Sequence, residues 1–75
     1  MGNIIFSVTE KNQAGNFVSE YFGDSREDAV KSFERKCELM GQDLAGWQKE
    51  MGANSCVWQN GNEMRMIEIV ENNIM

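Results

Sequence analysis

The sequence predicts a small α+β domain in the order ββαββ: a four-stranded antiparallel sheet built from two β-hairpins, with one main helix packed on one face. Three patterns predict this fold. Apolar residues alternate with polar ones near the N-terminus, apolar residues recur at helical spacing in the middle, and Asn60-Gly61 marks a hairpin near the C-terminus. The length of 75 residues leaves room for a single core, so residues 1–75 are expected to form one domain.

The first predicted hairpin pairs residues 4–10 with residues 17–22. In the first strand the side chains that point to one face are Ile4, Phe6 and Val8. The connection, residues 11–16, is polar and contains Gly15, which can adopt the positive φ of a tight turn. The second strand is rich in aromatic residues. The pattern leaves its buried face open, because two pairs of apolar residues compete for it: Val18 with Phe22, and Phe17 with Tyr21.

A helix is predicted over residues 25–40. Asp24 or Ser25 can cap its N-terminus, and an acidic residue three positions later completes a capping box. Gly41 suits a left-handed C-terminal cap, so the helix is expected to end there. The helical stripe of apolar residues consists of Ala29, Val30, Phe33, Cys37 and Met40.

The segment between this helix and the last hairpin, residues 42–55, has two interpretations. Leu44, Trp47 and Met51 keep a helical spacing, which favours a short second helix at 43–51. Two glycines weaken that pattern, so an ordered loop satisfies it equally well. In either case Trp47 is expected to cover the small core, because a large aromatic beside such a core usually packs into it.

The second predicted hairpin has Asn60-Gly61 as its two-residue turn, with strands over 55–59 and 62–71. Gln59 then pairs with Asn62, and this register sets the two faces. One face carries Cys56, Trp58, Ile67 and Ile69, with Glu63 and Arg65. The other carries Val57, Met64, Met66 and Val70, with Gln59 and Glu68. Both faces are therefore partly apolar.

A single helix covers only one face of such a sheet, so something else is expected to cover the second face. The candidates are residues 42–55, the tail 72–75, a second copy of the chain, or a foreign partner. Apolar surface on both sides of the hairpin is thus the main clue to function.

The composition excludes much of catalytic chemistry. There is no histidine, and the two cysteines, Cys37 and Cys56, lack metal-ligand spacing, so no metal site and no cofactor are predicted. Both cysteines are expected to be small core residues. A thiol enzyme or redox protein would need one of them to have a depressed pKa. The prediction is that the protein is not an enzyme.

The net charge argues against binding of nucleic acid, and the distribution of apolar residues argues against a membrane span. The net charge is −5, and no basic stripe is present to neutralise phosphates. The rings available for base stacking are Trp58, Tyr21 and Phe17. No run approaches the roughly 20 apolar residues of a membrane span, and no signal peptide is recognisable, so the expected location is cytoplasmic.

The chain resembles the small accessory proteins of phages and mobile elements, including anti-CRISPR proteins. The resemblance covers the whole chain and rests on its size, its acidic charge, the Asn60-Gly61 hairpin and the capped helix start Asp24-Ser25-Arg26-Glu27-Asp28-Ala29. It carries over no functional residue. It implies an inhibitor that occupies a surface of a larger bacterial defence complex, without chemistry of its own.

These observations favour a non-enzymatic protein-binding module, of the phage-inhibitor type, whose partner is a larger bacterial protein or ribonucleoprotein complex. The predicted anchors are Val57, Met64, Met66 and Val70, and the predicted acidic rim is Glu68 and Glu20, facing basic groups of the partner. One alternative is a structural homodimer that buries the same patch against its copy. A less favoured alternative is a nucleic-acid-binding accessory protein.

Overall fold

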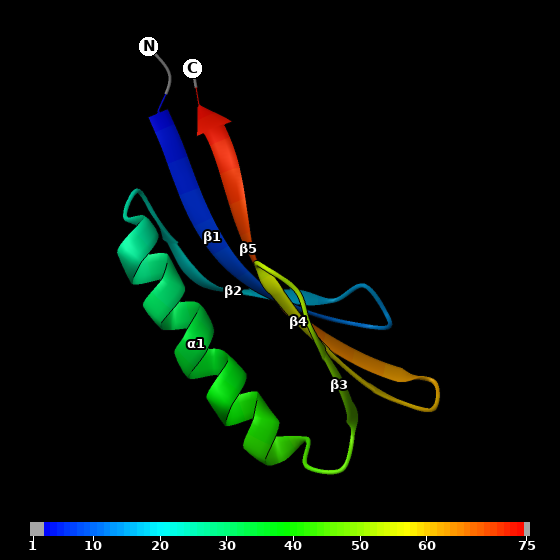
Figure 1. Ribbon diagram of the computed structural model, residues 1–75. Coiled ribbons are helices and arrows are strands. Elements are labelled where there is room, and N and C mark those ends of the chain that lie inside the picture. The colour runs from blue at the N-terminus through cyan, green and yellow to red at the C-terminus, as the bar shows by residue number, and fades with distance from the viewer. Residues whose placement is uncertain (1–2, 75) are drawn as a thin grey trace.

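The computed structural model describes residues 3–74, and it contains one helix packed against one face of a five-stranded antiparallel sheet (Figure 1). The strand order in the sheet is β2-β1-β5-β4-β3. Along the chain the elements are β1 (Asn3–Asn12), β2 (Phe17–Gly23), α1 (Arg26–Asp43), β3 (Gln48–Met51), β4 (Ser55–Asn60) and β5 (Glu63–Ile74). The α+β class is as predicted.

The prediction of four strands in the order ββαββ is wrong, because the segment after the helix contributes a fifth strand. Residues 43–51 do not form a second helix: β3 pairs with β4, with Gln48 opposite Gln59. The helical spacing in this segment is broken at Gly46, whose φ of +91° no right-handed helix accommodates. The Trp47 N–H donates to the Leu44 carbonyl at 3.0 Å, which closes the turn and directs the chain into the sheet.

The helix begins as predicted and ends later than predicted. The Ser25 hydroxyl accepts a hydrogen bond from the Asp28 N–H at 3.2 Å, so Ser25 is the N-cap. Gly41 lies inside α1, which continues to Asp43 and is capped at Leu44. The predicted stop at Gly41 is therefore wrong, because the chain takes its positive φ further on, at Gly46.

The first hairpin closes through a three-residue loop. Gly15, with a φ of +85°, donates its N–H to the Asn12 carbonyl at 3.0 Å, and the Asn12 N–H donates to the Asn16 carbonyl at 3.1 Å. This is the arrangement of a turn followed by a left-handed glycine. In β2 the register then shifts at Glu20, so that Ser19 and Tyr21 face consecutive residues of β1.

The second hairpin forms, but its register differs from the prediction by two positions. Asn60 pairs with Glu63, so the turn residues are Gly61 and Asn62 rather than Asn60 and Gly61. Gly61 has a φ of +61°, and within the described chain no residue other than glycine has a positive φ. One positive φ at the first turn position matches a type II′ turn, which needs glycine only there. A shift of two keeps every side chain on its predicted face.

The core lies between α1 and the sheet. Its buried members are Phe6, Val8, Ala29, Phe33, Cys37, Met40, Cys56, Trp58 and Ile67. Four of the five predicted helix positions are among them, and Trp47 packs against this core as predicted. Burial of each large apolar side chain contributes about 1.5–3 kcal/mol before the entropy cost of ordering it.

Candidate protein-binding face

The sheet has one face that α1 does not cover, called here the open face. It is formed by the side chains that alternate with the buried ones along each strand. Its apolar members are Ile5, Phe17, Phe22, Val57, Met64, Met66 and Val70. None of these is buried in the described chain, so this face is available for contact.

Two segments of the chain were expected as possible covers of the open face, and both join the sheet instead. Residues 48–51 join the sheet as β3, at its edge, instead of folding over it. Residues 72–74 continue β5, and Met75 lies outside the described residues. Within residues 3–74, neither of these segments covers the open face.

Backbone pairing arranges the side chains of the open face in rows across the strands, and the β1 member of each row is polar. One row runs from Phe17 through Lys11 and Met66 to Val57. A second joins Phe22 to Val70 through Ser7. The two phenylalanines at the sheet edge are 69% and 70% exposed, whereas the side chains further in are half-buried by their neighbours. The face therefore has a half-buried centre and a projecting aromatic margin.

Five of the six residues predicted as partner contacts lie on the open face: Val57, Met64, Met66, Glu68 and Val70. Glu20 does not join them. Its carboxylate reaches the helix side of the sheet and lies 3.5 Å from the Lys36 ammonium of α1. The sequence pattern leaves the buried face of this strand open, and the bulge, which adds one residue to β2, puts both Glu20 and Tyr21 on the helix side.

The acidic rim also differs from the prediction. The Glu68 carboxylate lies 2.7 Å from the Lys11 ammonium on the neighbouring strand, so its charge is balanced within the chain. Among the described residues of the open face, the carboxylate without an ion pair is that of Glu50, on β3. The sequence interpretation missed Glu50, because it did not predict a strand at 48–51.

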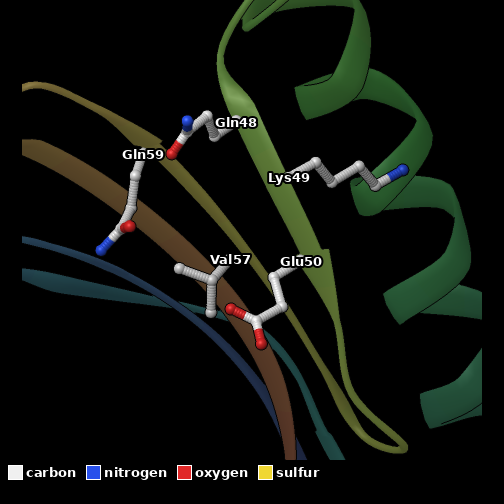
Figure 2. A pocket seen from close by; sticks show the side chains of 5 residues that line it. All are labelled: Gln48, Lys49, Glu50, Val57 and Gln59. Atoms are coloured by element: carbon white, nitrogen blue, oxygen red, sulfur yellow. The ribbon is translucent and has the colours of Figure 1, made fainter.

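Glu50 borders a shallow hollow of about 440 Å³ at the β3 end of the open face. Figure 2 shows Glu50, Val57, Gln48 and Gln59 on the same side of the two strands, with Lys49 directed the other way, toward α1. Lys49 also borders the hollow, and the side chains directed to this side of the strands are one carboxylate, two amide groups and one aliphatic side chain. This set can accept hydrogen bonds from a basic side chain and contact its aliphatic stem.

The helix side of the sheet carries an ion-pair network. Glu10 lies 3.1 Å from the Lys36 ammonium and 3.0 Å from the Arg65 guanidinium, and Lys36 also reaches Glu20. Partial burial lowers the pKa of Lys36, but Glu10 and Glu20 outweigh it, and the net pKa is raised. These charges are satisfied within the chain and hold α1 against β1 and β2.

The two cysteines lie together in the core, Cys37 on α1 and Cys56 on β4, both as free thiols. Burial, with a smaller contribution from the neighbouring Cys56, raises the pKa of the Cys37 thiol to about 12. Burial also raises the pKa of Cys56. A thiolate nucleophile needs a pKa lowered below its ordinary value, so the environment of both cysteines has the opposite effect.

The three aromatic rings considered for base stacking do not all lie on one exposed face. Trp58 is 1% exposed and packs beneath α1, where the Lys49 ammonium lies 5.7 Å from its ring centre. Tyr21 packs against the same core, and its hydroxyl donates to the Ser25 carbonyl at 3.3 Å. Of these three rings, Phe17 alone is on the open face.

Comparisons with protein-family models, with curated proteins and with solved structures find no match. Within residues 3–74, no helix is long and apolar enough to cross a membrane. In the same range, His, Cys, Asp and Glu side chains nowhere gather in the groups of three that could hold a metal ion.

Proposed function

We propose that this chain is a non-enzymatic protein-binding module and that the open face is its binding surface. One observation carries the proposal. Apolar side chains of β2, β5 and β4 lie on a face that the described chain leaves uncovered, with Lys11 and Ser7 of β1 between them, and two phenylalanines project at its margin. Exposed apolar side chains gathered on one face mark interaction sites.

The energetics favour a contact centred on the phenylalanines and the methionines. Burying an exposed aromatic side chain such as Phe17 or Phe22 contributes about 1.5–3 kcal/mol. Met64 and Met66 are flexible and polarizable, so they adapt to the shape of a partner. The unpaired Glu50 beside the two glutamine amides favours a partner that presents a lysine or arginine at that end.

A narrower form of the proposal is an inhibitor of the phage type that occupies a surface of a bacterial defence complex. Its support is the resemblance in size and charge to such accessory proteins. It predicts that the partner is a large cytoplasmic protein or ribonucleoprotein whose contact surface carries a basic group. Direct binding of nucleic acid is not part of the proposal, since the net charge is −5 and Trp58 is buried.

A homodimer through the open face is the second candidate. It is favoured by the near-central position of Met66 and Val57, which allows the same patch to meet itself about a two-fold axis. Light scattering at micromolar concentration separates the two candidates. A strict monomer contradicts the homodimer and is compatible with a foreign partner.

The experiment compares three immobilised forms of the full chain in a bacterial lysate: wild type, the double variant Met64→Ser/Met66→Ser, and the control Met51→Ser. Met51 is 59% exposed and pairs with Cys56, so the control makes the same chemical change on the helix side of the sheet. We expect the double variant to retain at least tenfold less of the specific partner than wild type, and the control to retain as much as wild type. Mass spectrometry quantifies the captured proteins, and circular dichroism checks the fold.

Two results contradict the proposal. Equal capture by all three forms would show that the open face is not the binding surface. Unfolding of the double variant while Met51→Ser stays folded would show that Met64 and Met66 are core residues and that the face is covered.

A further inference from the structure

The free edge of the sheet at β2 has an unusual composition for an exposed strand. β2 is the outermost strand on its side, and it spans seven residues, compared with four for β3 at the other edge. Three of its side chains, Phe17, Val18 and Phe22, are large, apolar and 59–70% exposed. Natural edge strands are usually short or protected by charged residues and proline, because an unprotected edge pairs with other strands.

The hydrogen-bond pattern shows which backbone groups of β2 are available. The Asn12 N–H bonds to the Asn16 carbonyl across the hairpin, so these two residues stand at a bonded position, and bonded positions alternate with non-bonded ones along an antiparallel ladder. The pair Glu10 and Val18 is therefore bonded. Phe17 and Ser19 consequently direct their N–H and carbonyl groups away from β1, toward solvent. Those groups can bond to an additional strand.

A hollow of about 280 Å³ lies between this edge and the helix. It is lined by Glu20 from β2 and by Ser32, Arg35, Lys36 and Leu39 from α1. Leu39 is 48% exposed, so the helix wall of the hollow offers an apolar contact. A strand added beside β2 would direct alternate side chains into this hollow and the others toward Phe17 and Phe22 on the open face.

The charges of the hollow indicate what the added strand carries. Glu20 is balanced by Lys36 at 3.5 Å, and Lys36 is also held by Glu10 at 3.1 Å. Arg35 takes part in none of the ion pairs that residues 3–74 form. The unbalanced charge of the hollow is thus a guanidinium, which binds carboxylates through two parallel hydrogen bonds.

We infer that the β2 edge is a second docking site, which shares Phe17 and Phe22 with the margin of the open face, and that its occupant is an extended segment of a partner protein. The segment adds to the sheet as a sixth strand, with apolar residues at alternate positions and an aspartate or glutamate directed to Arg35. Main-chain hydrogen bonds supply affinity, and the hollow selects the side chains, as in other cases of strand addition to a sheet edge.

A second copy of this chain fits the edge less well. Antiparallel pairing of two β2 strands about their centre brings the Glu20 residues of the two copies together. Both helices then lie on the same face of the joined sheet, with Arg35 and Lys36 of each copy near those of the other. Like charges in such positions are destabilising, whereas an acidic segment complements Arg35.

The test uses the full-length protein and a library of random twelve-residue peptides displayed on phage. We expect selection to enrich peptides with apolar residues at alternate positions and at least one acidic residue. A synthetic copy of the most enriched peptide should bind the Ser19→Pro protein about tenfold more weakly than the wild-type protein. The substitution removes the outward N–H of residue 19 and leaves the hydrogen bonds between β2 and β1 intact. The same peptide should bind the Arg35→Gln protein about fivefold or more weakly than the wild-type protein, and this difference in affinity should become smaller in high salt.

Two control variants distinguish binding at the β2 edge from binding at the open face. Lys31→Gln removes a cation from α1 outside the hollow, and Met66→Ser alters the open face, so neither should change peptide affinity. Amide exchange at Phe17 and Ser19 should slow when the peptide binds, which tests the edge even if Ser19→Pro does not fold. The inference is overturned if no peptide is enriched, if binding ignores Arg35→Gln and leaves these amides unprotected, or if Ser19→Pro instead abolishes a dimer.

Discussion

Replacing glycine by alanine at positions 41 and 46 tests where the helix ends. A Cβ built at either position meets no atom within 4 Å, so packing is the same for both and only the backbone differs. Gly41 lies inside α1, where alanine is more favourable than glycine by about 0.5–1 kcal/mol. Gly46 has a φ of +91°, where an L side chain costs about 1–2 kcal/mol. The two substitutions should therefore change stability in opposite directions.

Thermal unfolding followed by circular dichroism measures both effects. For a domain of this size, 1 kcal/mol shifts Tm by roughly 4–8 °C. Gly41→Ala should raise Tm by about 2–8 °C, and Gly46→Ala should lower it by about 4–16 °C. If Gly41→Ala lowers Tm while Gly46→Ala leaves it unchanged, then Gly41 holds the left-handed cap and the helix stops where the sequence pattern placed it.

Three further predictions concern the core, the thiols and the helix cap. Ile67 is fully buried, whereas its neighbour Met66 is on the open face. In guanidinium unfolding, Ile67→Ala should therefore lower the free energy of unfolding by about 2–5 kcal/mol, and Met66→Ala should lower it by less than about 1.5 kcal/mol. Equal losses would mean that both faces of the sheet are covered. Because the pKa of Cys37 rises from 9.0 to about 12 on folding, its contribution to stability is complete below pH 9 and is lost between pH 9 and 12. The free energy of unfolding should fall over that range more steeply for wild type than for Cys37→Ala, and parallel curves would contradict this. Ser25→Ala removes the N-cap and should lower the free energy of unfolding by about 1 kcal/mol. Ser25→Asp keeps a capping oxygen and should retain most of the wild-type stability. If the alanine variant loses no stability, the cap contributes nothing.

The parts of the fold that the sequence predicts well depend on neighbouring residues. Ser25 caps the helix through its own side chain, and Phe33 and Cys37 recur at helical spacing, so both signals act within a few residues. The second hairpin is similarly local. Its register was predicted two positions off, because Asn60-Gly61 suggests a turn with two positive φ values whereas the chain uses one, at Gly61.

The fifth strand was not predictable from local pattern. Residues 48–51 are polar apart from Met51, and they become a strand because β4 offers a free edge to pair with. Helical spacing of Leu44, Trp47 and Met51 pointed elsewhere, although Trp47 was correctly assigned to the core. Sheet pairing of this kind is a property of the assembled domain, which single-residue propensities do not contain.

In the candidate binding face, too, the features set by local pattern were predictable and those set by strand pairing were not. Met64, Met66 and Val70 were placed on the correct face, since an error of two positions preserves alternation. Glu20 lies on the other face, where the β-bulge of the first hairpin puts it beside Tyr21, and a bulge is not visible in the strand pattern. Glu50 was missed, since no strand was predicted at 48–51. The apolar part of the site was therefore readable and its charged part was not.

The position of β5 has a consequence for how this protein reaches its native state. β5 lies between β1 and β4, so it joins the β1–β2 hairpin and helix to the β3–β4 pair (Figure 1). Its pairing with β1 connects residues from opposite ends of the described chain, and closing so long a loop slows folding. Until β5 pairs with β1, the two parts of the sheet are not joined, and the backbone groups along the facing edges of β1 and β5 stay open to solvent. Removal of β5 should therefore leave two separate fragments instead of a smaller folded domain, and we expect the chain to acquire its sheet in one late, cooperative step.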